Sequence, residues 1–228
     1  MLSTQSTKIT KVISYNLRKG KASADLKSLV LVYNVDFLCL QEINSATAPQ
    51  SIGPLILADM TTTQRLGLAL YYNPHTYTLV KTKGYALRKS MHDYILAPAE
   101  QRLLVGSFTR VSDHTPLAIA SFHASPLSAT NSLRRKQIAA AHDLLDKFSL
   151  GTPILMAGDY NYPLFKKKLK NAVTENGYSM TLSDKLTYTR MLPGHFDFIT
   201  SANATIQGVK TLPKGISDHR PILISMSV

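Results

Sequence analysis

Short apolar stretches with the character of β-strands recur from one end of the chain to the other. Several alternate apolar and polar residues, as strands with one solvated face do, whereas residues 154–157 are continuously apolar and suit a central strand covered on both faces. We predict strands over residues 9–17, 36–41, 66–72, 102–110, 116–122, 153–157, 196–200 and 222–226.

Apolar residues recur at helical spacing in three places. These are residues 26–33, residues 133–148, which give the longest and clearest pattern, and the lysine-rich residues 164–172. Many strands with a few interspersed helices predict an α/β (α+β) fold in which sheets pack together under outer helices. No Pro/Gly/Ser-rich linker or shift in composition divides the chain, so we predict a single domain over residues 1–228.

Polar side chains suited to metal or phosphate chemistry stand repeatedly where an apolar stretch ends or begins. Taken singly, each is typical of a cap, a turn or a structural histidine. Loops at strand ends are where catalytic groups concentrate, so the recurrence at six places indicates a site. In chain order the residues are Asn16, Glu42, His123, Asp159 with Asn161, Asp197, and Asp218 with His219.

The charge balance points to an anionic partner. The chain has 26 Lys and Arg against 14 Asp and Glu, a net charge of +12, which suits nucleic acid, acidic lipid or a phosphorylated small molecule. Basic residues cluster at 18–21, 88–89, 134–136 and 166–170, and the first cluster directly follows Asn16. The alternative for residues 166–170 is an ordinary solvated helix face.

Hydrolysis of a phosphodiester bond would use this set of side chains. Negative charge develops on the phosphate oxygens, and a hard cation such as Mg²⁺, which prefers one or two carboxylates, offsets it. Glu42 is the first choice of metal ligand, with Asn16 and Asp218 as helpers. Asp159, poised by the amide of Asn161, would orient and deprotonate the attacking water.

The remaining pair, Asp197 and His219, would act on the phosphate itself. A carboxylate beside the ring holds its orientation and raises its pKa, which favours the imidazolium. Other chemistries lack their signatures. Cys39 is the single cysteine, which rules out an internal disulfide and Cys/His zinc spacing, and no Gly-rich Walker loop or Gly-x-Ser-x-Gly elbow occurs.

These motifs resemble the DNase I-like endonuclease/exonuclease/phosphatase superfamily. The resemblance implies a four-layer α/β sandwich, in which two packed, mostly antiparallel β-sheets are flanked by helices. The matching segments span most of the chain in the family's order: Ser14-Tyr-Asn16, Leu40-Gln-Glu42, Phe122-His123, Gly158-Asp-Tyr-Asn161, Phe196-Asp197-Phe and Ser217-Asp-His-Arg-Pro-Ile222.

By this resemblance, Glu42 looks like the principal metal ligand, and Asn16 and Asp218 look like supporting residues of the metal site. Asp159 and Asn161 look like the pair that activates the water and orients the phosphate.

The resemblance also extends to the residues that would contact the phosphate. His219, backed by Asp197, looks like the residue that acts on the scissile phosphate, and His123 matches a second active-site histidine. Arg102 stands where DNase I-like members place a phosphate-binding arginine, with a solvated strand-edge arginine as the alternative. Arg18, at the expected rim of the cleft, is the other candidate for substrate binding.

The function expected from this resemblance together with the basic charge is that of a Mg²⁺-dependent nuclease, with Mn²⁺ as the alternative metal. Its expected substrate is nucleic acid, DNA rather than RNA. A phosphodiesterase or phosphatase acting on lipid headgroups or small phosphate esters is the alternative. A histidine at position 123 and Tyr162-Pro163 after the Gly-Asp-x-Asn motif favour the DNase I and sphingomyelinase side over abasic-site and retrotransposon endonucleases. A non-catalytic module is disfavoured because every core motif residue is present.

Few sequence features bear on partners and location. No obligate protein partner is evident, and no apolar run is long enough to span a membrane. The Ser/Thr-rich start lacks the apolar middle of a signal peptide, which favours a cytoplasmic protein. A chain trimmed from a longer precursor would instead be secreted or tethered to a membrane.

Overall fold

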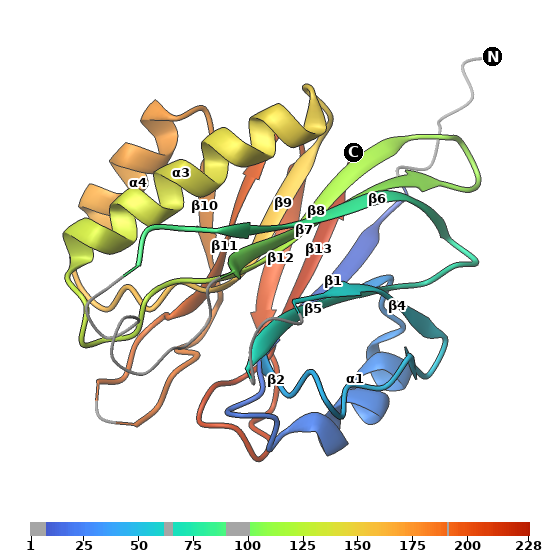
Figure 1. Ribbon diagram of the computed structural model, residues 1–228, viewed down its shortest axis with the longest axis horizontal. Coiled ribbons are helices and arrows are strands. Elements are labelled where there is room, and N and C mark those ends of the chain that lie inside the picture. The colour runs from blue at the N-terminus through green and yellow to red at the C-terminus, as the bar shows by residue number, and fades with distance from the viewer. Residues whose placement is uncertain (1–7, 62–65, 90–100, 191) are drawn as a thin grey trace.

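Two β-sheets packed against each other form the centre of the computed structural model, which describes residues 8–61, 66–89, 101–190 and 192–228 (Figure 1). The seven-stranded sheet has, in spatial order, β12 (Thr205–Thr211), β13 (Ile222–Ser227), β1 (Thr10–Asn16), β2 (Phe37–Ile43), β5 (Gly67–Tyr72), β4 (Leu55–Met60) and β3 (Ser51–Ile52). The six-stranded sheet has β10 (Ser179–Leu182), β11 (Asp197–Ala202), β9 (Ile154–Asp159), β8 (Pro116–His123), β7 (Gln101–Arg110) and β6 (Tyr77–Ala86).

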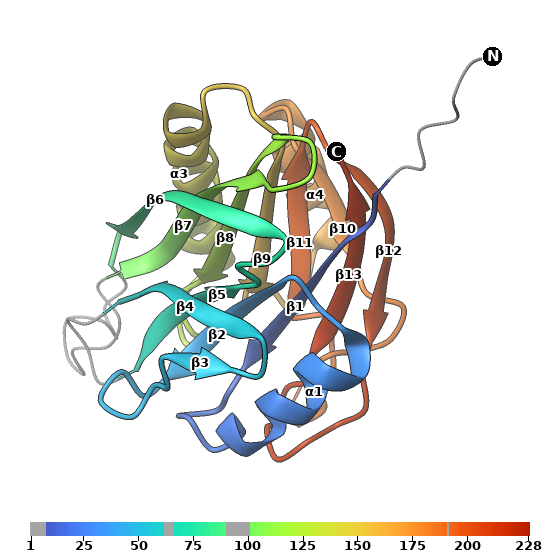
Figure 2. The ribbon, with the colours of Figure 1, turned by 90° about the vertical axis from the view of Figure 1, so that its right-hand side faces the viewer.

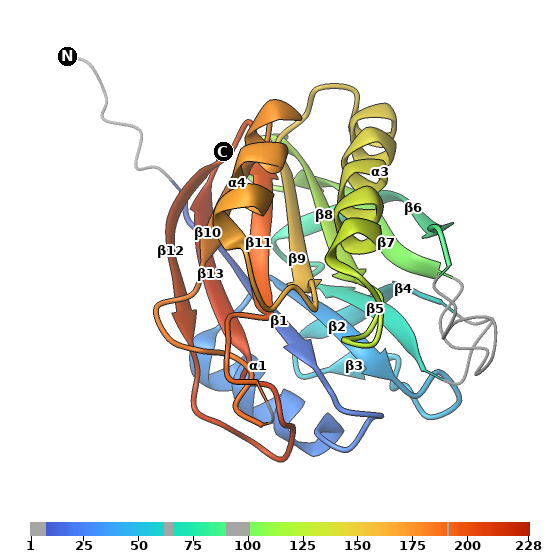
Figure 3. The same cartoon turned by 90° about the vertical axis from the view of Figure 1, so that its left-hand side faces the viewer.

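Both sheets are mostly antiparallel. One pair in each is parallel, β1 with β2 and β8 with β9. The helices α1 (Leu26–Tyr33), α3 (Asn131–Ser149) and α4 (Lys166–Glu175) lie outside the sheets, and a short 3₁₀ turn, η1 (Ser23–Asp25), precedes α1. Figure 2 shows α1 against the seven-stranded sheet, and Figure 3 shows α3 and α4 side by side over the six-stranded sheet.

Three apolar clusters lie between these layers. The central cluster joins the inner faces of the two sheets and contains Phe37 and Phe108, whose ring centroids lie 4.8 Å apart. A second cluster joins the six-stranded sheet to α3 and α4, and a third joins the seven-stranded sheet to α1. Burial of apolar surface on both faces of each sheet holds the four layers together. The predicted four-layer sandwich is therefore confirmed.

All eight predicted strands are present, and none of their ends is shifted by more than two residues. The five strands that the pattern missed are β3, β4, β6, β10 and β12, and they lie at the outer ends of the two sheets. In β6 only Tyr77 is buried and the other side chains are partly or fully exposed, because an edge strand is only partly covered. Such strands carry a weak hydrophobic period.

The third predicted helix begins later than expected. Residues 164–172 were predicted to be helical, but α4 starts at Lys166, and Phe165 before it has a left-handed φ of 63°. Leu164 and Phe165 are therefore exposed loop residues, 60% and 64% accessible. No described helix has the length and apolar character needed to cross a membrane. Residues 1–7, most of the Ser/Thr-rich start, lie outside the described part of the chain.

Candidate active site

The predicted site residues meet where strands of both sheets end. In the parallel pair β8–β9, His123 lies beside Asp159, and in the antiparallel pair β9–β11, Asp159 lies beside Asp197. A cavity of about 530 Å³ opens at this edge. Eight of the ten predicted residues line it: Arg18, Glu42, Arg102, His123, Asp159, Asn161, Asp218 and His219. The other two, Asn16 and Asp197, are buried behind the lining and bond to it.

Asp159 lies at the centre of the hydrogen bonds at this site. Its Oδ1 accepts from the backbone N–H of Asn161 at 2.9 Å, and its Oδ2 accepts from Nδ2 of Asn161 at 3.2 Å and Nδ2 of Asn16 at 3.0 Å. Asn161 adopts a left-handed φ of 47°, which turns its side chain back toward the carboxylate. Burial raises the pKa of Asp159 above its ordinary value, although nearby His219 acts in the opposite direction. A raised pKa makes this carboxylate a stronger base.

The glycine before Asp159 is required by a close approach between neighbouring strands. A Cβ at Gly158 would stand 1.9 Å from the backbone oxygen of Phe122 on β8. The absence of a side chain lets β9 pair closely with β8 and brings Asp159 beside His123. The glycine of the Gly-Asp-x-Asn motif therefore serves the geometry of the site.

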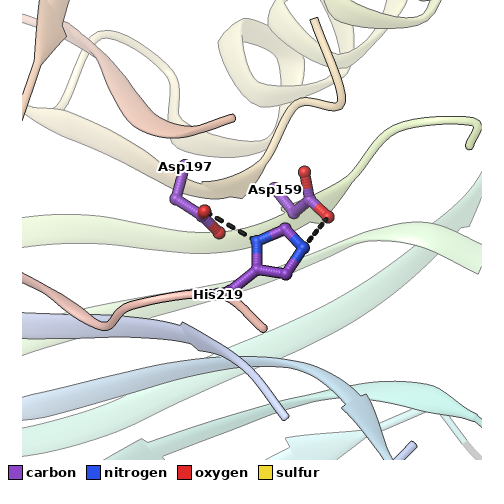
Figure 4. A group of neighbouring side chains, drawn as sticks. All are labelled: Asp159, Asp197 and His219. Atoms are coloured by element: carbon purple, nitrogen blue, oxygen red, sulfur yellow. Dashed lines mark hydrogen bonds and ion pairs between the residues drawn. The ribbon is translucent and has the colours of Figure 1, made fainter. Parts of the chain in front are cut away.

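His219 is held between two carboxylates (Figure 4). Its Nδ1 lies 2.8 Å from Oδ2 of Asp197, and its Nε2 lies 3.7 Å from Oδ2 of Asp159. Thr187 fixes the start of β11, because its hydroxyl accepts the backbone N–H of Asp197 at 3.0 Å. Burial lowers the pKa of His219, but Asp197 and Asp159 outweigh it and raise the pKa to about 10. The ring therefore carries a positive charge at neutral pH.

Glu42 projects into the cavity from a bulge in β2. The register between β2 and β5 shifts between Gln41 and Ile43, and Glu42 has a left-handed φ of 56°. A bulge next to a site re-aims a side chain, and a non-glycine residue in this conformation is strained. Oε2 of Glu42 accepts the backbone N–H of Lys19 at 2.8 Å. Below it, Gln41 is fully buried and ties the sheets together through Ser121 on β8, at 3.0 Å.

Asp218 lies between two arginines that line the cavity. Its Oδ2 is 3.6 Å from Nε of Arg18 and 3.4 Å from Nη1 of Arg190. Ser217 anchors this loop, because its hydroxyl donates to the backbone oxygen of Asn16 at 2.8 Å and accepts the N–H of His219 at 3.1 Å. The Ser-Asp-His motif is thereby fixed to the end of β1.

Arg102 and His123 complete the wall next to β7. Arg102 is only 2% exposed, and its Nη1 donates to the backbone oxygen of His123 at 3.1 Å. The solvated strand-edge alternative is therefore wrong. Nε2 of His123 lies 3.6 Å from Oδ2 of Asp159, which places the second histidine on the same carboxylate as the first.

Two sets of side chains qualify as metal ligands. Ligand atoms of Asp159, Asp197 and His219 lie within 4.8 Å of one another, so this buried group could hold a divalent ion. Asp197 and His219, however, already share a short hydrogen bond. Glu42 and Asp218 line the open cavity and offer carboxylate oxygens, which Mg²⁺ prefers to ring nitrogens. The oxygen donors at the cavity wall therefore fit Mg²⁺ better.

Several cavity residues had no signal in the sequence. Tyr188 and Arg190 come from a long segment without apolar periodicity, and the ring of Tyr188 packs 4.9 Å from that of His219. Lys166 does not line the cavity, and the sequence placed it only in a lysine cluster. Its Nζ donates to the backbone oxygens of Tyr162 and His195, which lie near Asp159 and Asp197 in sequence. Burial lowers the pKa of Lys166 to about 7. Of these residues, only Lys166 could have been suspected, from its place just after the Gly-Asp-x-Asn motif.

Comparisons with known proteins agree with this fold. The sequence model of the Endonuclease/Exonuclease/phosphatase family matches residues 13–219. Among solved structures, D. rerio TDP2 in complex with a single-strand DNA product has a TM-score of 0.77 at 14% identity, covering 97% of this chain and 100% of that one. A mannosyl-6-phosphatase from Bacteroides thetaiotaomicron gives 0.77 at 14% identity, with 96% and 100% covered. The human Nocturnin catalytic domain with bound sulfate gives 0.74 at 14%, with 96% and 94% covered. No curated protein matches the sequence.

Proposed function

The chain belongs to the endonuclease/exonuclease/phosphatase family, and we propose that it is a Mg²⁺-dependent nuclease that hydrolyses phosphodiester bonds, DNA in preference to RNA. The family's members are hydrolytic phosphoesterases, so the chain is a phosphoesterase. The observation that carries the nuclease proposal is a cavity that combines a basic carboxylate with an imidazolium and is bordered by Arg18, Lys19, Lys21 and Arg190.

Attack by water would begin at Asp159. This carboxylate is fully buried, held by Asn161 and Asn16, and has a raised pKa, so it is suited to take a proton from water. The water oxygen forms a bond to phosphorus while the bond to the leaving oxygen breaks on the opposite side. Asn161 and Asn16 keep the carboxylate in position as its charge is neutralised.

Stabilisation of the developing charge would come from His219. Its imidazolium faces the cavity at Nε2 and is oriented at Nδ1 by Asp197, so it can donate to a phosphate oxygen. Glu42, with Asn16 and Asp218, would hold Mg²⁺. When bound, the ion supplies positive charge to the phosphate oxygens. Arg18 and Arg102 would bind the phosphate at the rim and the wall of the cavity.

The surrounding charge favours nucleic acid over a small ester. A polyanionic strand that crosses the cavity would meet Arg18, Lys19, Lys21 and Arg190, all of which line it. The structural neighbours are compatible with both substrate classes, because they include a DNA complex of TDP2 and a mannosyl-6-phosphatase.

Incubation with supercoiled plasmid tests the proposal. We expect nicking that requires Mg²⁺ and stops with chelator, and we expect Glu42→Ala to abolish it. Lys27→Gln, on α1 away from the cavity, is the matched control and should cut as fast as the parent. An inert plasmid together with rapid turnover of a panel of small phosphate esters would refute the nuclease function and favour the alternative.

A further inference from the structure

The helices α3 and α4 begin at the same end of the six-stranded sheet (Figure 3), close to the cavity residue Asn161. Basic side chains and two exposed apolar ones gather there. Leu164 and Phe165 protrude before α4, 60% and 64% exposed. We call this the α3–α4 surface and define it by Arg135, Lys136, Leu164, Phe165, Lys167, Lys168 and Lys170. The mechanism described above uses none of these residues.

The α3–α4 surface starts at the cavity wall. Asn161 lines the cavity, and the chain runs from it through Leu164 and Phe165 into α4. Two hydrogen bonds tie this segment to α3: Arg135 Nη1 donates to the hydroxyl of Tyr162 at 2.9 Å, and Asn131 Nδ2 donates to the backbone oxygen of Leu164 at 3.4 Å. A chain-like ligand that leaves the cavity on this side would therefore pass over the exposed pair.

The charged side chains on this surface are all positive. Residues 124–142 and 160–174 contain no Asp or Glu. Lys167 and Lys170 are like charges three residues apart on α4, a pairing that weakens a helix, and a face selected for stability would include carboxylates. Across the cavity, the basic residues 18–21 follow β1 in the other sheet. A polyanion that spans the cavity would contact both basic regions, whereas a lipid headgroup would fill the cavity alone.

Phe165 supplies the chemistry that identifies the ligand. Its left-handed φ is uncommon for a bulky residue and leaves the ring at the surface. Nζ of Lys168 lies 5.7 Å from the centre of the ring. An exposed ring beside lysines matches the way in which proteins bind single-stranded nucleic acid, with a base stacked on the ring and phosphates at the ammonium groups. Bases within a duplex do not offer a free face for such stacking.

We infer that the α3–α4 surface binds an unpaired stretch of nucleic acid outside the cavity, with a base stacked on Phe165 and phosphates at Lys167 and Lys168. The inference rests on the proposed nuclease function for the nature of the ligand. It predicts a binding site that is separate from the cleavage chemistry, so that binding and hydrolysis can be measured independently.

The test is fluorescence anisotropy with a labelled single-stranded oligodeoxynucleotide of about 20 nucleotides, in chelator so that no cleavage occurs. We expect Phe165→Ala to weaken binding about tenfold, as expected for one stacked base, and Phe165→Tyr to retain it. We expect Lys167→Gln with Lys168→Gln to reduce the slope of log K against log salt by about 1.4, since each phosphate contact on a single strand contributes about 0.7. Lys27→Gln with Leu31→Ala, exposed positions on α1, is the matched control and should leave both values unchanged.

Each outcome separates this inference from the proposed function. Unchanged affinity and salt slope in the Phe165 and lysine variants would overturn the inference, even for a chain that nicks plasmid. The inference would also be overturned if the variants lost binding to phosphatidylserine vesicles but kept full affinity for the oligonucleotide, because the surface would then bind a membrane. Oligonucleotide binding that depends on Phe165, in a chain that cleaves no nucleic acid, would support the inference and refute the nuclease function.

Discussion

Replacement of Asp197 by asparagine should change the pH dependence of hydrolysis and not merely its rate. Asp197 is fully buried, and its Oδ2 lies 2.8 Å from Nδ1 of His219. The substitution keeps the shape of the side chain but removes its charge. The imidazolium of His219 loses the partner that contributes most to raising its pKa.

The size of the effect follows from the pKa. With a pKa of about 10, His219 is charged at pH 8 in about 99% of molecules. In Asp197→Asn, burial and the remaining charge of Asp159 act in opposite directions. Burial is the larger of the two influences, so the pKa falls to the ordinary histidine value of about 6.5 or below it, and at most about 3% of rings stay charged at pH 8. We therefore expect a loss of at least about 30-fold at pH 8, and a much smaller loss at pH 6.

Initial rates with a phosphodiester substrate across pH 5.5 to about 9.5 measure this effect. In the parent, the imidazolium form and the activity that needs it should persist until the pH approaches 10, whereas in the variant the alkaline limb should move to near neutral pH. Thermal unfolding of both proteins at each pH controls for loss of folding. An equal loss at pH 6 and pH 8 in a folded variant would show that the charge on His219 is not what Asp197 supplies.

Three further changes test other parts of the structure. Gly158→Ala should destabilise the fold by about 3 kcal/mol or more in urea unfolding, because its Cβ would collide with the backbone oxygen of Phe122. Gly208→Ala is the control, because nothing lies within 4 Å of its Cβ, and similar losses in the two variants would refute the close approach at Gly158. Burial lowers the pKa of His142 to about 3, so below about pH 6.5 the unfolded chain takes up a proton that the folded chain does not, and the free energy of unfolding falls by about 2–3 kcal/mol by pH 4.5. The His142→Gln variant should therefore lose less stability than the parent over that interval, and an equal loss would contradict this. Arg190→Ala should raise KM several-fold with little change in kcat, because this half-exposed side chain lies at the cavity rim, and a fall in kcat alone would place it in the chemical step.

The parts of the fold that the sequence predicts are those buried on both faces. Central strands such as β9 are continuously apolar because layers cover both sides, and that pattern is visible locally. The edge strands β6 and β12 are covered unevenly, so their residues follow no strict period. The start of α4 was misplaced for a related reason. Leu164 and Phe165 fit a helical apolar pattern, yet both are exposed, and the left-handed turn at Phe165 depends on how the preceding loop packs.

The same distinction explains which site residues were found. Asp159 ends β9 and Asp197 begins β11, so their positions follow from strand register, which a sequence pattern carries. Glu42 lies near the end of β2, where a bulge turns it into the cavity. Tyr188 and Arg190 reach the cavity only because their loop crosses back to pair with His219, an isolated bridge between residues far apart in the chain. No local pattern encodes that return path. The chemistry of the site is therefore readable from strand ends, whereas the loops that shape its rim, and with it the choice of substrate, depend on tertiary packing.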